Sequence, residues 1–190
     1  MSKAVLISIR PKWCEKIVGG EKTIEVRKTR PKLETPFKVY IYCTSGRPDL
    51  NIPISPERLM RDYLDTGSMR SLNCPLGNGK VVGEFTCDNI ATYNYDYCPH
   101  PEIGMDYDCG DSWWEIADED LKSACLTEKE FRYYVFGSEA VYGWHIACLK
   151  IYDTPKPLSE FKGLRKTKFG YEPVEIKRPP QSWCYVEGLK

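Results

Sequence analysis

Hydrophobic residues near the start of the chain follow first a strand pattern and then a helical one. Residues 4–9 form a nearly continuous apolar run, which is typical of a buried strand. Pro11 follows, and because proline is well tolerated in a first helical turn, it predicts the start of a short helix. Trp13 and Ile17 are four residues apart and would form the inward face of that helix. The pair Gly19-Gly20 predicts its end, with one glycine in the left-handed conformation.

The residues after this glycine pair predict a second strand that gathers charged groups. Ile24 and Val26 would face the core, while Glu25 and Arg27 would share the opposite face. Lys22 comes directly after the turn, so its long side chain can reach over the strand end. A lysine, a carboxylate and a guanidinium at the mouth of a helix–turn–strand unit indicate a candidate site. The alternative is an edge strand whose charges protect against aggregation.

Alternating apolar and polar residues predict further elements later in the chain. A basic connection, residues 29–32, joins the second strand to the third. A capping box at residues 127–130 predicts a helix that runs to Phe136, and a basic, turn-rich passage follows Pro157. Strands are predicted over residues 37–43, 80–87, 141–152 and 183–187.

Two segments interrupt this pattern. Residues 44–80 are rich in Pro and Gly around one helix, with Ser55 as its N-cap and Pro56 as its first residue. Residues 88–125 are acidic, aromatic and irregular. The sequence therefore predicts a single α+β domain over residues 1–190, a small β-barrel of five to six mixed strands with short helices and these two insertions.

Charge is balanced over the whole chain but unevenly distributed. Residues 1–47 contain eleven Lys/Arg and four Asp/Glu, and residues 150–190 contain nine and five. Residues 83–130 contain two Lys/Arg and thirteen Asp/Glu. If the two ends of the chain pack together, they form a basic surface that can attract an anionic partner.

Composition argues against several classes of protein. No segment approaches the roughly 18 apolar residues of a membrane span, and the first apolar run is too short for a signal peptide, so we expect a cytoplasmic protein without a membrane partner. The nine cysteines are odd in number and are interpreted as small buried hydrophobes in a reducing compartment. Cys98, His100 and Cys109 are the best metal candidates but lack paired ligand spacing. We therefore expect no metal, no cofactor and no obligate protein partner.

Taken in order, these motifs resemble the ASCH domain family, part of the PUA-like superfamily, in its bacterial and phage form. The resemblance rests on residues 7–11, the short helix after them, and Gly20-x-Lys22-x-x-Glu25-x-Arg27, which matches the family's G-x-K-x-x-E-x-R motif. Residues 142–152 and 178–185 are similar to the late barrel strand and the closing segment of the same proteins. The acidic middle of the chain lies outside the resemblance.

The resemblance implies an RNA-associated barrel that binds RNA or a modified nucleoside in a cleft lined by the motif. Arg27 offers a bidentate fork for a phosphate or a base edge, Lys22 adds a point charge, and Glu25 can accept from an exocyclic amine. Aromatic side chains would stack an unpaired base. The residues expected to bind are Lys22, Glu25, Arg27, Arg10, Trp13, Tyr42, Trp144, His145 and Trp183.

Other functions are compatible with the same residues. A resemblance to N4-acetylcytidine amidohydrolase implies a hydrolase, or a metal-independent ribonuclease, with Lys22 and Glu25 as catalytic residues. That enzyme has threonine where this chain has Glu25, and a carboxylate there stabilises a charged lysine. His145 is either a general base or a structural hydrogen-bonding residue. A protein-interaction adaptor that uses residues 89–120 is a further alternative.

The position of the Lys22 amine separates these hypotheses. An amine buried beside Arg27 favours chemistry. A salt bridge to Glu25 favours binding, or an ion pair that only braces the mouth of the barrel.

Overall fold

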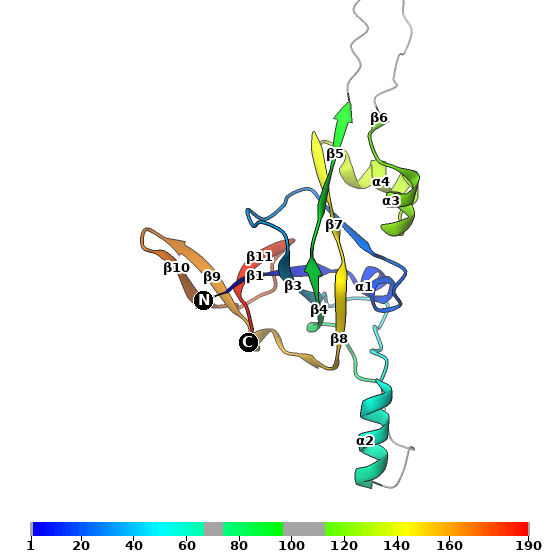
Figure 1. The fold of residues 1–190 in the computed structure, drawn as a ribbon, viewed down its shortest axis with the longest axis vertical. Helices are drawn as coiled ribbons and strands as arrows, with labels where there is room; N and C mark the ends of the chain where they lie inside the picture. The colour runs from blue at the N-terminus through cyan, green and yellow to red at the C-terminus, as the bar shows by residue number, and fades with distance from the viewer. Residues whose placement is uncertain (1, 67–73, 97–112, 190) are drawn as a thin grey trace, which may run out of the picture.

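Two β-sheets form the body of the protein (Figure 1). The computed structural model describes residues 2–66, 74–96 and 113–189. The larger sheet has seven strands in the order β10 (Gly170–Glu175), β9 (Lys162–Thr167), β11 (Trp183–Glu187), β1 (Lys3–Ile9), β3 (Phe37–Cys43), β4 (Lys80–Cys87) and β8 (Ala147–Lys156). The smaller sheet has the order β2 (Ile24–Arg27), β7 (Ala140–His145), β5 (Ile90–Asp96) and β6 (Trp113–Trp114).

Strand β1 lies in the middle of the larger sheet. Every residue of β1 after the first is buried, as the apolar run predicts. β1 pairs in parallel with β3 and antiparallel with β11, so that Ile7 lies between Ile41 and Trp183. The sheet is therefore mixed, as predicted, and it places the two basic ends of the chain side by side.

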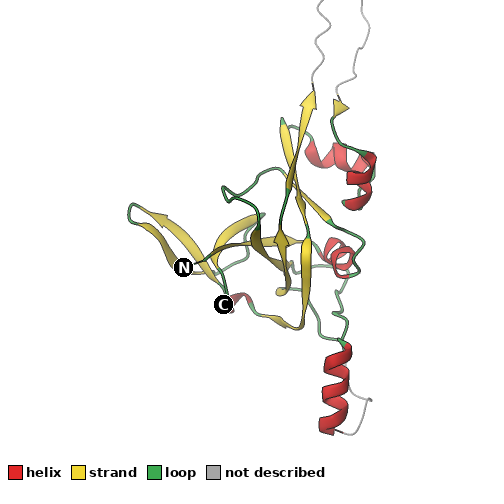
Figure 2. Cartoon of the chain, in the orientation of Figure 1, coloured by secondary structure: helices red, strands yellow, loops and turns green. Residues whose placement is uncertain are grey.

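The helices lie at the margins of the sheets, and α2 projects from the body (Figure 2). The predicted capping box is present: Glu130 N–H donates to Thr127 Oγ1 (3.2 Å), and Thr127 N–H donates to the Glu130 carboxylate (3.0 Å). Gly20 has φ of 75°, which is the predicted left-handed residue after the first helix. The helices are α1 (Pro11–Val18), α2 (Pro56–Thr66), α3 (Asp118–Ser123), α4 (Glu128–Val135) and the 3₁₀ helix η1 (Leu158–Glu160).

The segment predicted as one strand over residues 141–152 is two strands in different sheets. β7 lies between β2 and β5 in the smaller sheet, whereas β8 pairs with β4 at the edge of the larger one. The chain changes sheet at Ile146, whose N–H donates to the carbonyl oxygen of Thr23 (2.8 Å). Pairing with distant strands therefore overrides the continuous local pattern.

The prediction of five to six strands is wrong, since the described residues form eleven. Two of the extra strands, β9 and β10, form a hairpin in the passage predicted to be turn-rich. β5 and α3 lie within residues 88–125, so the described part of this segment is not wholly irregular. The mixed α+β class is confirmed, but the strand pairing of the described residues closes neither sheet into a barrel.

Buried side chains fill the space between these elements. One cluster lies between β1, β3, β4 and α1 and contains Trp144. A second packs α3 and α4 against the smaller sheet, where Ile24 and Val26 contribute to the same cluster as Phe131. The inward direction of Ile24 and Val26 is therefore confirmed. Within the described part of the chain, no helix has the length and apolar character needed to cross a membrane.

Candidate functional site

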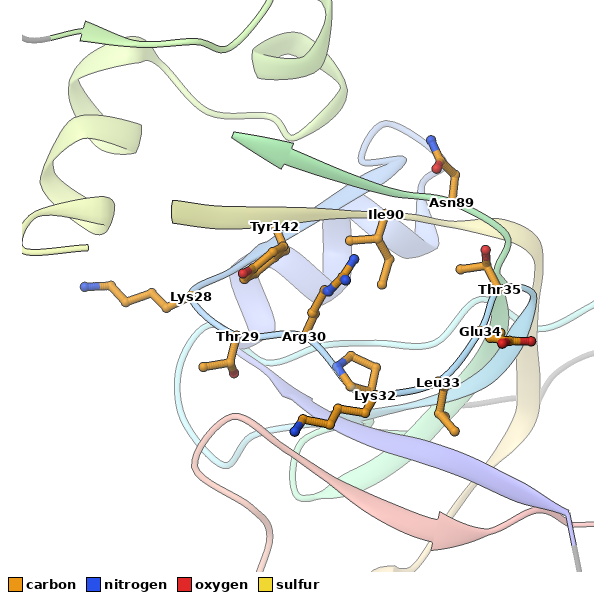
Figure 3. Close-up of a pocket in the computed structure, with 11 residues that line it drawn as sticks. Lys28, Thr29, Arg30, Lys32, Leu33, Glu34, Thr35, Asn89, Ile90 and Tyr142 are labelled. Carbon is orange, nitrogen blue, oxygen red and sulfur yellow. The ribbon is translucent and has the colours of Figure 1, made fainter. Parts of the chain in front are cut away.

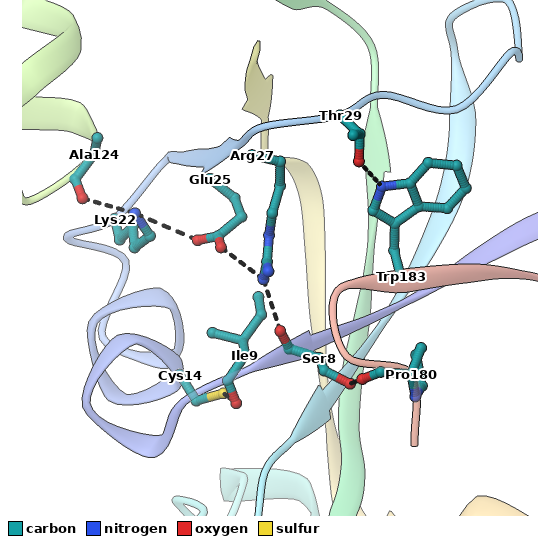
Figure 4. A network of polar contacts seen from close by, with 10 residues as sticks. All are labelled: Ser8, Ile9, Cys14, Lys22, Glu25, Arg27, Thr29, Ala124, Pro180 and Trp183. Carbon is teal, nitrogen blue, oxygen red and sulfur yellow. Dashed lines mark hydrogen bonds and ion pairs between the residues drawn. The ribbon is translucent and has the colours of Figure 1, made fainter. Parts of the chain in front are cut away.

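Lys22 lies two residues before β2 and is buried, with only 3% of its side chain exposed. Its Nζ donates to the carbonyl oxygen of Ala124, just after α3, at 2.7 Å and lies 3.4 Å from Oε2 of Glu25 (Figure 4). The ring of Trp13 lies 5.2 Å from the same nitrogen. Because a buried charge is costly unless it is paired and hydrogen-bonded, these contacts explain how the lysine is accommodated. This is the salt-bridged arrangement, which favours binding or bracing over chemistry.

Arg27 extends the network from Glu25 to β1. Its Nη2 lies 2.8 Å from Oε1 of Glu25 and donates to the carbonyl oxygen of Ser8 at 2.7 Å. Ser8 in turn donates through Oγ to the carbonyl oxygen of Pro180 at 2.6 Å (Figure 4). The network therefore connects the end of α3, β2, β1 and the segment before β11.

Two buried donors on this side of the smaller sheet have no hydrogen-bond partner among the described residues: Arg27 Nε and Trp144 Nε1. Glu25 lies opposite Trp144 in the β2–β7 ladder, so Arg27, two residues on, shares a face with this ring. An unsatisfied buried N–H costs roughly 1–3 kcal/mol. Such donors call for an explanation, and an acceptor supplied by solvent or a ligand would satisfy them.

An open pocket of about 960 Å³ lies along the loop between β2 and β3. Arg30 extends toward Ile90 and Tyr142, and its guanidinium carbon lies 5.6 Å from the centre of the Tyr142 ring (Figure 3). This places a planar cation beside an aromatic face. The charged side chains that line the pocket are Lys28, Arg30, Lys32 and Glu34, and its apolar side is formed by Leu33, Ile90 and Tyr142.

Tyr142 connects this pocket to the buried network. It lies opposite Arg27 in the β2–β7 ladder, so the two side chains lie on the same face. Lys22, Glu25 and Arg27 themselves do not line the pocket. The motif was expected to line a cleft, but its three charged groups are buried beside the pocket, where Glu25 is ion-paired with both Lys22 and Arg27.

The aromatic candidates occupy different environments. Trp144 is fully buried, and Tyr42 is only 5% exposed. This burial corrects the prediction that their rings would stack an unpaired base. Trp13 is half-buried beside Lys22, and Trp183 is half-buried and donates through Nε1 to Thr29 Oγ1 at 3.0 Å.

His145 and Arg10 lie outside the buried network. His145 Nδ1 is 2.6 Å from Oδ1 of Asp88, and both side chains are 46% exposed. The hydrogen bond from His145 lowers the pKa of the Asp88 carboxyl. This contact is the one expected if His145 is a structural hydrogen-bonding residue rather than a general base. Arg10 is the exposed N-cap residue of α1, and the metal candidates Cys98, His100 and Cys109 lie outside the described residues.

The pocket residues were not identified as a site from the sequence. The only signal was the basic connection at residues 29–32, which contains Arg30 and Lys32. Ile90 and Tyr142 reach the same pocket from β5 and β7. Sequence spacing alone could not bring these three segments together.

Comparisons with known proteins give a structural likeness only. No protein-family model matches the sequence, and no curated protein matches it significantly. The crystal structure of ASCH from Zymomonas mobilis matches 97% of this chain and 87% of its own, with 17% identity and a TM-score of 0.47. Two point mutants of that protein match 97% of this chain at 16% and 17% identity, with TM-scores of 0.47 and 0.48, and 90% and 88% of their own chains are covered. This likeness assigns no ligand and no activity.

Proposed function

We propose that the protein binds RNA or a modified nucleoside in the pocket formed by the loop between β2 and β3. The observation that carries this proposal is the position of Arg30, an exposed cation beside the Tyr142 ring in an open basic pocket. Unpaired bases are recognised by stacking on aromatic rings or guanidinium planes, and phosphates by Lys and Arg. In the proposal, Arg30 and Tyr142 supply the first kind of contact and Lys32 supplies the second. Lys28 Nζ instead donates to the carbonyl oxygen of Phe136 at 3.1 Å.

The dimensions of the pocket suit such a ligand. Its volume of about 960 Å³ lies within the roughly 300–1,000 Å³ of small-molecule sites. Three cations against one carboxylate give the lining a positive balance. In the proposal, the Lys22–Glu25–Arg27 network positions the strand that leads into the loop. The two buried donors are close to Tyr142, because Arg27 is opposite Tyr142 in the β2–β7 ladder and Trp144 is two residues further along β7.

The contacts of Lys22 do not favour hydrolysis. An amine that acts as a base or nucleophile needs a free lone pair directed at the substrate. The Lys22 amine instead donates to a carbonyl and is ion-paired with Glu25. We therefore propose a positioning role for Lys22 and Glu25, with binding as the function.

Binding of a fluorescently labelled oligouridylate, followed by anisotropy, tests this proposal. We expect Arg30→Ala to weaken binding at least tenfold, because it removes both a charge and a stacking plane, and Arg30→Lys to recover only the charge. Each phosphate contact, such as that of Lys32, would contribute about −0.7 to the slope of log affinity against log salt for a single strand.

Arg61→Ala is the matched control, because Arg61 is an exposed arginine on α2, away from the pocket. Equal affinity of the Arg30→Ala and Arg61→Ala proteins would refute the assignment of the pocket. Absence of measurable binding to uridine monophosphate, modified nucleosides and RNA would refute the function.

A further inference from the structure

A row of three aromatic rings runs from the pocket loop across the larger sheet. Trp183 and Tyr185 on β11 have ring centres 5.3 Å apart, and Tyr185 and Tyr171 on β10 have ring centres 6.1 Å apart. Both pairs meet edge to face, at 73°. We call these three residues the aromatic strip. Tyr171 is 38% exposed, and the other two are half-buried.

The aromatic strip begins at the loop that forms the basic pocket. Trp183 Nε1 donates to Thr29 Oγ1 at 3.0 Å, and the backbone N–H of Lys32 donates to Tyr185 Oη at 2.7 Å. Thr29 and Lys32 also line the pocket. The same short loop therefore has the pocket on one side and the aromatic strip on the other.

Two lysines lie at the Tyr171 end of the aromatic strip. Lys3 Nζ lies 3.6 Å from the centre of the Tyr171 ring and 4.4 Å from that of Tyr185. Lys166 is directly opposite Tyr171 in the β9–β10 ladder, so its exposed side chain is on the same face. Lys3 and Lys166 thus place two cations beside Tyr171 and Tyr185, and aromatic rings accompanied by cations match the chemistry of single-stranded nucleic acid, which presents bases and phosphates together.

The strip ends on a hairpin that projects from the body (Figure 1). Lys162, Lys166 and Lys168 on β9 and the turn after it are exposed, whereas Arg165 lies on the opposite face and is ion-paired with Glu172 of β10 at 3.7 Å. Phe169 at the turn is 86% exposed. Exposed aromatic and basic side chains thus extend the surface beyond Tyr171.

We propose that RNA bound at the pocket continues as a single strand over the aromatic strip onto the β9–β10 hairpin. The protein then takes a polynucleotide, and the pocket is one end of a longer track. This inference rests on the proposed function and adds the length and path of the ligand to it. It also uses the two basic ends of the chain, which β1 and β11 bring together.

A peptide is the competing occupant of this edge, since β10 is the outermost strand and an extended chain can pair with it. Pro173 lies in the middle of β10 and has no N–H to donate to such a chain. The cations beside the rings would also attract a negatively charged partner. Both features favour the polynucleotide.

The test compares a short and a long ligand on the full chain. Uridine monophosphate is titrated against an oligouridylate of about twelve nucleotides, within the roughly 4–16 nucleotides that single-strand modules cover. We expect Tyr171→Ala to weaken binding of the oligonucleotide at least about fivefold, the lower end for loss of one base–aromatic stack. Tyr171→Phe should retain binding. Lys166→Ala should weaken binding of the oligonucleotide and make its affinity less dependent on salt.

Matched controls are Tyr133→Ala and Lys129→Ala, two exposed residues on α4. None of these changes should alter the affinity for uridine monophosphate, whereas Arg30→Ala should weaken both ligands. If the Tyr171 and Lys166 variants bind the oligonucleotide as the controls do, or if it binds no more tightly than uridine monophosphate, the track is refuted while the pocket stands. If no ligand binds the unaltered protein, the proposed function itself fails, and the track fails with it.

Discussion

Replacing Glu25 by glutamine removes a carboxylate that contacts two largely buried cations. Lys22 and Arg27 lie 3.4 and 2.8 Å from its oxygens. Only 3% of the Lys22 side chain, 11% of the Arg27 side chain and 8% of the Glu25 side chain are exposed. Each cation keeps one carbonyl partner, Ala124 for the lysine and Ser8 for the arginine. Both would nevertheless remain in the interior without a counter-charge, which is the costly half of a buried ion pair.

The expected loss of stability is about 3 kcal/mol, the lower end of the roughly 3–5 kcal/mol for breaking a buried pair, because glutamine retains one acceptor oxygen. For a chain of this size each kcal/mol lowers the melting temperature by roughly 2–4 °C, so the expected decrease is roughly 6–12 °C. Urea unfolding followed by tryptophan fluorescence measures the free energy, and an unchanged dependence on urea shows that the same surface is exposed.

Glu21→Gln provides the matched control. Glu21 lies only 2.6 Å from Lys16, a shorter contact than either contact of Glu25, but these two side chains are 59% and 38% exposed. Solvent screens such a pair, so this change should alter stability little. The Lys22→Met/Glu25→Gln double variant should lose less stability than the sum of the losses in the two single variants, because the two side chains interact. Equal unfolding free energies for Glu25→Gln and Glu21→Gln would refute the reasoning that burial decides the contribution.

Two further predictions concern the packing around the site. Gly143→Ala would place a methyl carbon 2.6 Å from Tyr93 Oη and 2.8 Å from Tyr93 Cε2, so we expect a loss of about 1–3 kcal/mol in urea unfolding, and an unchanged midpoint would contradict this close packing. Burial raises the pKa of Cys184 from 9.0 to about 11, so its contribution to stability is complete below pH 9 and is lost as the pH rises through about 11. At neutral pH iodoacetamide should modify Cys184 more slowly than the exposed Cys148, as read by mass spectrometry of the separate peptides, and equal rates would contradict this.

The strands nearest the chain start were predictable because their local pattern agrees with their surroundings. Residues 4–9 are apolar except for Ser8 and are buried on both faces, and Pro11 and Gly20 bound the first helix as their backbone chemistry requires. The capping box before α4 was likewise predictable from Thr127 and Glu130 alone. In each case a few neighbouring residues determine the structure.

Other features depend on contacts between distant segments. Nothing in the apolar run after Val141 indicates that the chain changes sheet at Ile146, because this depends on pairing with β2 and β4. The β9–β10 hairpin was missed because most of its side chains are exposed, which removes the contrast that marks a half-buried strand.

The candidate site shows the same division. The sequence placed Lys22, Glu25 and Arg27 together, and the structure joins them in one network. It gave no sign that Lys22 would be buried, since burial depends on the carbonyl of Ala124, which lies 102 residues further along the chain. The pocket also needs Tyr142, which only the β2–β7 pairing brings opposite Arg27.

Photo-crosslinking of the full chain to a 4-thiouridine oligonucleotide tests the proposed binding pocket most directly, because it maps contact without altering the protein. We predict crosslinked peptides within residues 28–35 and at Tyr142, lost when uridine monophosphate is added in excess. Crosslinks that are confined to α2 or α4 and spare residues 28–35 would contradict the proposal.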